Sequence, residues 1–440
     1  MDKFIKKLFR LRIEFCGFYL FVSFIVMPYS YAQEPFFKKE KIIPFHHEHV
    51  HGSSIVELPN GDLLATWFQG SGERWADDVR ILGSRKKFNK EDWSPAFLMA
   101  DVKEFPDINP ILFIDGKNRL WLMWYTVIAN QWSTSLINYR LSEDYLEMDG
   151  APVWNWQENL LVKPGGKTEH GILPGDRFVE SVDRQLEEYY DYLRSINNNE
   201  VNEVWKPWAD RIRSLAAGEN MIRQGRGIYS DEQRGYPYYR RIGWQTRSKP
   251  IITASSRLIL PLYSDGLGIC LMALSDDCGE NWFFSEPLVG FVEQPTIAVT
   301  ASGKLVAYMR NNGPPPRRLH VSHSTDEGES WSLMEYSEFP NPASAADVVT
   351  LNDGSWVLIY NDTESGRHSL VVSLSEDEGE TWPWTRTVEY DEPGEISAHY
   401  PAIIQGYNDV IHATYSLFAD NSQKKTVVYS TFNKEWIKQE

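Results

Sequence analysis

The sequence predicts an all-β chain folded as a β-propeller, because one turn motif recurs at a nearly constant interval with strand-like runs between its copies. The motif Ser-x-Asp-x-Gly-x-x-Trp begins at Ser275, Ser324 and Ser375, so the intervals are 49 and 51 residues. A fourth, degraded copy is expected between Ser84 and Trp93. Four short strands in a repeat of about fifty residues are typical of propeller blades.

Each copy of the motif has the chemistry of a tight hairpin turn. Its Asp can accept hydrogen bonds from backbone N–H groups, its Gly supplies a positive φ, and its Trp can pack beneath the turn. The runs at 258–263, 304–309 and 355–360 read as strands, and each follows a turn signal such as Asn-Asp-Gly. The motif therefore predicts fold and carries no information about activity.

One segment departs from the strand pattern. Residues 177–226 place apolar side chains such as Phe178, Val182 and Leu186 at helical spacing. We expect a helical insertion there, which serves either as a solvated decoration or as an element that covers substrate. Once it is subtracted, the remaining chain of this 440-residue protein fills six or seven blades.

The N-terminal segment has the pattern of a signal peptide. A basic stretch precedes the apolar run 15–27, and Ser30-Tyr31-Ala32 fits a small-x-small cleavage site. We expect residues 1–32 to be removed and residues 33–440 to form one propeller domain that is periplasmic or secreted, with no membrane span. The alternative is an uncleaved anchor.

Cysteine usage does not predict a disulfide framework. Cys16 lies in the expected signal peptide, and a bridge between Cys270 and Cys278 is left open by their spacing alone.

Charge narrows the range of partners. The formal net charge is −17, which argues against a nucleic-acid partner. An acidic substrate would need a local cluster of Arg side chains. Because aromatic residues make up 14% of the chain, side chains for a core and for stacking on sugar rings are plentiful.

The repeated motif resembles the Asp-box, or BNR, repeat of the sialidase superfamily. The resemblance covers most of the chain and implies a sialidase-type propeller, for which six blades are favoured over seven. It also implies an acidic carbohydrate as substrate. We expect neither a cofactor nor a metal.

In that family three Arg side chains bind the substrate carboxylate, and the resemblance places their three positions on this sequence. The resemblance assigns His51 to the position of the first carboxylate-binding Arg, and assigns the other two to Arg310 and Arg367. Two Arg side chains suffice to hold a carboxylate through forked hydrogen bonds.

The remaining catalytic positions are assigned in the same way. Tyr400 matches the nucleophilic Tyr, and Gln294 stands where the family has the Glu that polarises it. Asp77 and Asp78 lie in the acidic loop after the first blade, and Asp78 is the candidate general acid. His51 and Gln294 are the two departures from the family pattern.

These departures favour a second reaction over hydrolysis of sialic acid. In a uronic acid the C5 proton becomes removable once the carboxylate is neutralised, because the charge that develops is then stabilised. We expect Arg310 and Arg367 to neutralise it, with His51 as base or acid and Tyr400 as its partner. The product would be an unsaturated uronate formed by a lyase or a dehydratase, and some propeller enzymes that act on rhamnose–uronate linkages look similar. The alternatives are an exo-sialidase-like glycoside hydrolase and a non-catalytic glycan-binding propeller.

Other interpretations of these residues stay open. His47, His49 and His51 share one face if they lie on a strand, where they are strand-end residues, metal ligands or, for His49 and His51, substrate contacts. Arg310 and Arg367 can be surface ion pairs, and Tyr400 can belong to the core.

A further cluster, residues 236–249, alternates aromatic, amide and cationic groups. It fits a sugar-binding surface or a strand with a basic edge. Arg247 in this cluster is the candidate that restores the third positive charge.

Overall fold

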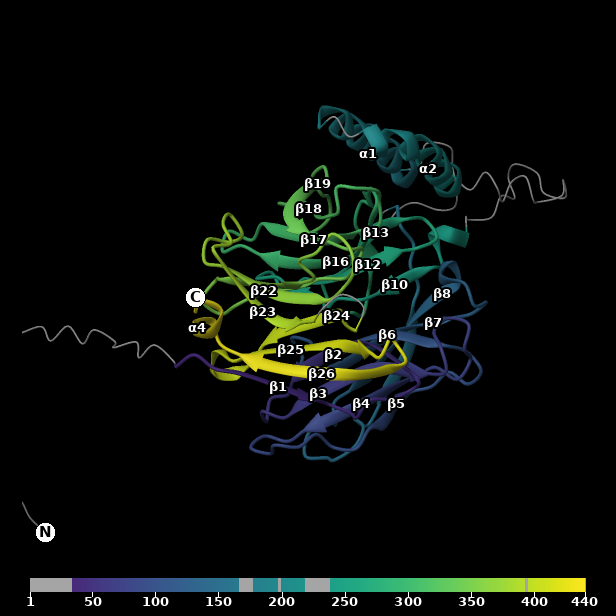
Figure 1. Ribbon diagram of the computed structural model, residues 1–440. Coiled ribbons are helices and arrows are strands. Elements are labelled where there is room, and N and C mark those ends of the chain that lie inside the picture. Colours follow the sequence, from purple (N-terminus) through teal and green to yellow (C-terminus); the bar gives the residue numbers. More distant parts are fainter. Residues whose placement is uncertain (1–33, 166–176, 197–198, 218–237, 392–394, 440) are drawn as a thin grey trace, which may run out of the picture. The chain divides into compact units, whose positions relative to one another are not determined.

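The computed structural model describes residues 34–165, 177–196, 199–217, 238–391 and 395–439, and Figure 1 shows their arrangement. The expected signal peptide lies outside these ranges. Within them, no helix combines the length and the apolar character that a membrane span needs.

Over these residues the strands form six antiparallel sheets, which we number as blades in chain order. Blade 1 contains β2 (His49–Glu57), β3 (Leu63–Gly70), β4 (Arg80–Lys86) and β5 (Phe97–Ala100). Blade 2 contains β6 (Asp107–Ile114), β7 (Leu120–Val127), β8 (Ser135–Ser142) and β9 (Trp156–Leu160). Blade 3 contains β10 (Trp244–Thr246), β11 (Ile251–Ile252), β12 (Leu258–Ser264), β13 (Ile269–Ser275), β14 (Phe283–Phe284) and β15 (Leu288–Val289). Blade 4 contains β16 (Val292–Val299), β17 (Leu305–Asn311), β18 (Arg318–Ser324) and β19 (Glu335–Pro340). Blade 5 contains β20 (Asp347–Thr350), β21 (Trp356–Tyr360), β22 (Ser369–Ser375) and β23 (Trp384–Tyr390). Blade 6 contains β24 (Ile396–Gln405), β25 (Ile411–Ala419), β26 (Lys424–Phe432) and β1 (Phe37–Lys41). The prediction of an all-β, six-bladed propeller is confirmed.

Blade 6 joins the two ends of the described chain. Strand β1 pairs antiparallel with β26, with Phe37 opposite Phe432, and the purple and yellow strands lie side by side in Figure 1. This pairing gives blade 6 its fourth strand and closes the ring of blades.

The first strands of four blades carry the same irregularity. The register of β2, β6, β16 and β24 shifts at a β-bulge, and one residue at each bulge has a positive φ. These residues are Gly52, Asn109, Gln294 and Tyr400. At Gly52 a side chain is also excluded by space, because a Cβ would lie 2.5 Å from Asn109 Oδ1. Since a bulge re-aims the side chains beside it, the four strands turn polar groups toward one shared region.

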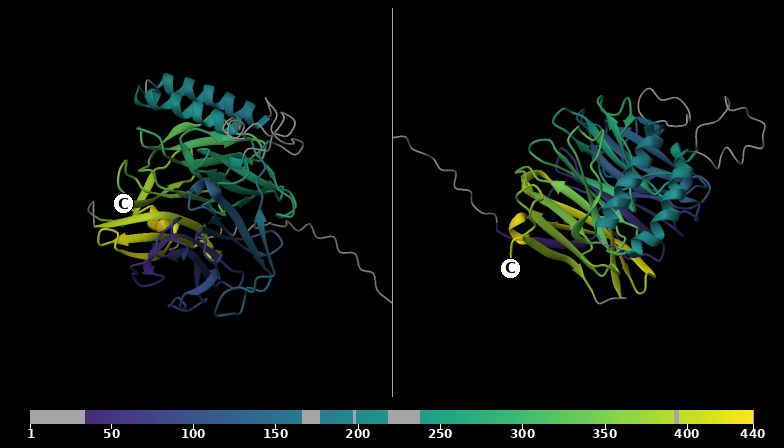
Figure 2. Two further views of the ribbon diagram at one scale, coloured as in Figure 1. Left: turned by 90° about the vertical axis from the view of Figure 1, so that its right-hand side faces the viewer. Right: turned by 90° about the horizontal axis from the view of Figure 1, so that it is seen from above.

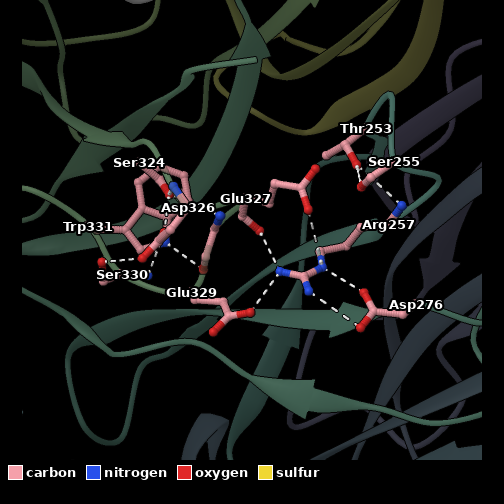
Figure 3. Close-up of polar contacts among 11 residues, drawn as sticks. Thr253, Ser255, Arg257, Asp276, Ser324, Asp326, Glu327, Glu329, Ser330 and Trp331 are labelled. Atoms are coloured by element: carbon pink, nitrogen blue, oxygen red, sulfur yellow. Dashed lines mark hydrogen bonds and ion pairs between the residues drawn. The ribbon is translucent and has the colours of Figure 1, made fainter.

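The Asp-box turns have the hydrogen bonds that the sequence predicts, as Figure 3 shows for the copy in blade 4. Asp326 Oδ1 accepts from Ser330 N at 3.0 Å and from Ser324 Oγ at 2.8 Å. Gly328 has a φ of 86°, and Trp331 Nε1 donates to its carbonyl oxygen at 3.1 Å.

The degraded copy in blade 1 lacks the box serine. Ser84 bonds to Ser94 as Ser322 bonds to Ser332, so Ser84 corresponds to a position two residues before the box serine Ser324. Cys270 and Cys278 are both free thiols.

Arg257 connects the Asp-box turns of two neighbouring blades (Figure 3). Its guanidinium lies 2.6 Å from Asp276 Oδ1 in blade 3 and 3.0 Å from Glu329 Oε1 in blade 4. The same group covers the ring of Phe283 at 5.1 Å.

We expect Arg257→Ala to lower the free energy of unfolding by about 1–2 kcal/mol, because two ion pairs and the packing of the side chain are lost together. Urea denaturation measures this, with Arg318→Ala as the control because Arg318 pairs with the exposed Glu364. An equal effect of the two variants would contradict a connecting role for Arg257.

Two helices make up the described part of the insertion, α1 (Arg177–Ser195) and α2 (Asn199–Ala217). The prediction of helices in this segment is confirmed as far as residue 217, and residues 218–226 lie outside the described ranges. Both helices lie along the flank of blades 3 and 4 (Figures 1 and 2). Gln185 bonds to Pro287 O at 2.6 Å, and Tyr189 Oη lies 2.6 Å from His320 Nε2 of β18. Helix α1 therefore packs against the outer strands of blades 3 and 4.

His320 is fully buried beneath this helix, and burial lowers its pKa to about 3. In the unfolded chain a histidine binds its proton near pH 6.5, so stability falls as the pH drops below that value, by about 1.4 kcal/mol per pH unit. We therefore expect the unfolding free energy of His320→Gln to change by about 2 kcal/mol less than that of the wild type between pH 7 and pH 5. Urea denaturation at both pH values tests this, with the exposed His47→Gln as control; an unchanged pH dependence in His320→Gln would contradict it.

Candidate active site

The bulged strands surround a cavity of about 180 Å³. Residues of blades 1, 2, 3, 4 and 6 line it: His51, Phe68, Glu73, Ile108, Asn109, Tyr125, Trp132, Gln245, Tyr263, Asp265, Glu293, Gln294, Arg310, Asn312 and Tyr400. Four of the residues predicted for the site, His51, Gln294, Arg310 and Tyr400, lie together in this lining.

The phenol oxygen of Tyr400 is held by two nitrogen donors. Arg310 Nη1 and Gln294 Nε2 each donate to it at 3.1 Å. The orientation of the Gln294 amide follows from its other end, where Oε1 accepts from Arg310 Nη1 at 3.2 Å. Both donors stabilise negative charge on the phenol oxygen, and the guanidinium does so as a cation.

Three further groups surround the Tyr400 ring. The His51 ring lies 4.3 Å from it between centroids, and the guanidinium carbons of Arg247 and Arg367 lie 5.0 and 5.6 Å from its centroid. Tyr400 is half-buried, so it is not a plain core residue, and its surroundings are strongly electropositive.

Arg247 contributes to this site from below the surface. Its side chain is 2% exposed, and its guanidinium donates to Ser53 O at 3.3 Å and Pro401 O at 2.8 Å. It does not line the cavity. Its charge therefore adds to the positive potential around the Tyr400 ring, although its side chain does not line the cavity.

Arg367 lies outside the cavity lining, fixed by His399. Its Nη1 donates to His399 Nδ1 at 2.6 Å, and its Nη2 donates to Ala343 O at 2.7 Å. Because a guanidinium only donates, His399 Nδ1 must accept, and its Nε2–H then donates to Ser397 Oγ at 2.8 Å. Burial, followed by the Arg367 charge, lowers the pKa of His399 well below its usual range, which agrees with a neutral ring.

His51 is also kept neutral. Burial, and then the neighbouring His49, lowers the pKa of His51 well below its usual range. His49 Nε2 lies 3.0 Å from Glu73 Oε1 at the cavity edge, whereas His47 is exposed. In the described part of the chain no group of three metal-ligating side chains gathers.

The acidic loop contributes a different carboxylate from the one predicted. Asp77 and Asp78 are exposed and do not line the cavity. Asp78 accepts bonds from Ser71 N and Ser71 Oγ, and these bonds lower its pKa against the opposing effect of desolvation. A carboxyl that holds its proton less tightly is poorly suited as a general acid at neutral pH. Glu73, in the same loop, is the residue that reaches the cavity.

Sequence reasoning also missed Glu293, Asn109 and Tyr263. Glu293 precedes Gln294, and in a regular strand the two would point to opposite faces; the bulge lets both line the cavity. Asn109 Nδ2 donates to Tyr263 Oη at 3.4 Å, a contact between blades 2 and 3 that no local pattern reveals. The residues 238–249 of the aromatic–cationic cluster contribute Gln245 to the lining.

Comparisons with known proteins agree with this architecture. A family model described as a BNR repeat-like domain matches residues 61–171 and 244–413, and no curated protein matches the chain.

Among solved structures, a Dyadobacter fermentans protein of unknown function is similar with a TM-score of 0.60 and 13% identity over 90% of this chain and 98% of that one. The Ruminococcus gnavus intramolecular trans-sialidase has a TM-score of 0.58 and 13% identity over 89% and 96% of the chains. The leech intramolecular trans-sialidase has a TM-score of 0.60 and 12% identity over 91% and 71%. At such identities these structures show a shared fold.

Proposed function

The chain belongs to the BNR repeat-like family and has the sialidase-type propeller, and from that premise we propose that it is a carbohydrate-active enzyme that cleaves an acidic sugar by β-elimination. The cavity would hold a uronate, and the Tyr400 oxygen would remove its C5 proton. The product would be a sugar with a C4=C5 double bond. We also propose that the protein acts in the periplasm or after secretion.

The observation that carries this proposal is the set of donors at the Tyr400 oxygen. Arg310 and Gln294 both donate to it, and no carboxylate of the described residues is hydrogen-bonded to it. Both donors would stabilise the negative charge that this oxygen carries when it acts as a base.

The cavity also retains polar atoms that a sugar can satisfy. His51 Nδ1, Asn109 Oδ1 and Arg310 Nε are buried and have no hydrogen-bond partner among the described residues. Buried polar atoms are normally paired, so these three support a polar ligand. Arg310 lines the cavity, where its guanidinium can bind a carboxylate, whose neutralisation makes the C5 proton more acidic.

A second candidate is hydrolysis with Tyr400 as the nucleophile. The pairing of Tyr400 with Arg310 favours it, because a phenolate is also the nucleophilic form. Gln294 and the neutral His51 favour elimination, since the family's polarising Glu and its first Arg are both replaced. A propeller that only binds glycans is the third possibility.

The experiment that separates these functions incubates the protein with sialosides, with 4-O-rhamnosyl glucuronate and with other uronate oligosaccharides. Mass and ultraviolet absorbance are read together. We expect an absorbing, unsaturated uronate from at least one uronate substrate, and a mass loss of one water without cleavage would identify a dehydratase. Free sialic acid or a saturated uronate without absorbance would contradict elimination, and binding without any product would support the third possibility.

A further inference from the structure

We propose that Glu293 is the general acid of this site, and that its carboxyl proton passes to the O4 oxygen that leaves the uronate. This inference rests on the proposed β-elimination. It assigns to Glu293 the role that was predicted for Asp78, which lies outside the cavity lining.

The position of Glu293 suits this role. Glu293 on β16 pairs with Arg310 on β17, and its Oε2 lies 3.9 Å from Arg310 Nη1. The same Nη1 donates to the Tyr400 oxygen at 3.1 Å. Phenol and carboxyl therefore flank one guanidinium nitrogen. In a uronate bound by Arg310, C5 carries the carboxylate and C4 is its neighbour, so the base and the acid must both lie beside the carboxylate-binding group.

The surroundings of Glu293 favour its protonated form at neutral pH. Its side chain is 9% exposed, and burial raises its pKa to about 8 although the Arg310 charge opposes this shift. The exposed Asp265 adds to the shift by its charge and by a hydrogen bond, whereas a bond with Asn312 opposes it. Tyr263 and the buried thiol of Cys270 are the other titratable groups near this carboxyl.

The other carboxylates of the cavity are less suitable. Glu73 Oε1 lies 3.0 Å from His49 Nε2, so this carboxylate is already paired with the His49 ring. Asp265 is exposed. A carboxyl kept neutral by burial can donate a proton where an ionised one cannot.

The reaction balances without a further reactant. The C5–H bond breaks and its proton moves to the Tyr400 phenolate oxygen. Its electron pair forms the C4=C5 bond as the C4–O4 bond breaks, and O4 takes the proton of Glu293. Exchange of protons with water then returns Tyr400 to phenolate and Glu293 to its acid.

The test compares two probes that differ in leaving group, 4-O-rhamnosyl glucuronate and 4-O-(4-nitrophenyl) glucuronate. The nitrophenolate needs no proton to depart. We expect Glu293→Gln to lower kcat by about 10²-fold on the rhamnosyl probe and to leave kcat on the nitrophenyl probe within a few-fold of the wild type. The activity on the second probe shows in the same experiment that the variant is folded, and the exposed Glu338→Gln serves as control.

The outcomes distinguish this inference from the function on which it rests. Equal losses on both probes, or no loss on either, would overturn the role of Glu293 while elimination by the wild type stands. Wild-type protein that forms no unsaturated product from either probe would overturn the proposed function and this inference with it.

Discussion

Tyr400→Phe is expected to lower kcat for elimination by about 10⁴-fold, the largest loss of any single substitution considered, because it removes the atom that accepts the C5 proton. The substitution deletes one oxygen and keeps the ring against which His51, Arg247 and Arg367 pack. Substrate binding should therefore change far less than kcat. Steady-state kinetics by ultraviolet absorbance, together with calorimetric titration of substrate into the variant, separate the two effects.

A matched control is Tyr360→Phe. Tyr360 is buried, and its hydroxyl is hydrogen-bonded to Ser373 in blade 5, away from the cavity lining. We expect it to keep wild-type kcat. If Tyr400→Phe retained activity within about tenfold of the wild type, a proton-transfer role for this phenol would be wrong.

Arg310 is expected to give the second largest effect. Its guanidinium donates to the Tyr400 oxygen and lines the cavity, where we propose that it binds the substrate carboxylate. Lysine keeps the charge and loses the planar fork, so we expect Arg310→Lys to lower kcat/KM on a uronate by about 10³-fold. Arg318→Ala, on the adjacent strand β18, is the control and should leave kcat/KM unchanged.

The substrate side of this prediction uses a carboxyl-reduced analogue. The analogue cannot make the carboxylate contact, so it should bind the wild type weakly, and its affinity for Arg310→Lys should be nearly the same. A variant that lost affinity for the acidic and the reduced sugar by the same factor would show that Arg310 stabilises the cavity and does not recognise the carboxylate.

The sequence predicts the blades well because their turns are local. Ser324, Asp326, Gly328 and Trp331 interact within eight residues, and nothing distant is needed to form the turn. The helices of the insertion are equally readable, since their apolar spacing is a local property. The closure of the ring by β1 and β26 depends on a pairing between the two ends of the chain and has no local signal.

The site was predicted in part, for a related reason. His51, Gln294, Arg310 and Tyr400 could be placed together only through the resemblance to a family, because they come from three different blades, 1, 4 and 6. Glu293 was missed because a β-bulge cannot be recognised from the alternation of residues along a strand. Glu73 was missed because the path of a loop cannot be deduced from its residue types. Arg367 and Arg247 approach the ring of Tyr400 and not the cavity, a difference set by hydrogen bonds to His399 and to backbone carbonyls.

The central claim is that this cavity removes the C5 proton of a uronate and adds no water across the cleaved bond. Wild-type protein would be incubated with 4-O-rhamnosyl glucuronate that carries deuterium at C5, in water enriched in heavy oxygen, and the products would be weighed by mass spectrometry. We predict an unsaturated uronate that has lost the deuterium and contains no heavy oxygen, together with a slower reaction than that of the unlabelled sugar. A saturated uronate that keeps its deuterium, released together with rhamnose that has gained one heavy oxygen, would contradict elimination and indicate hydrolysis.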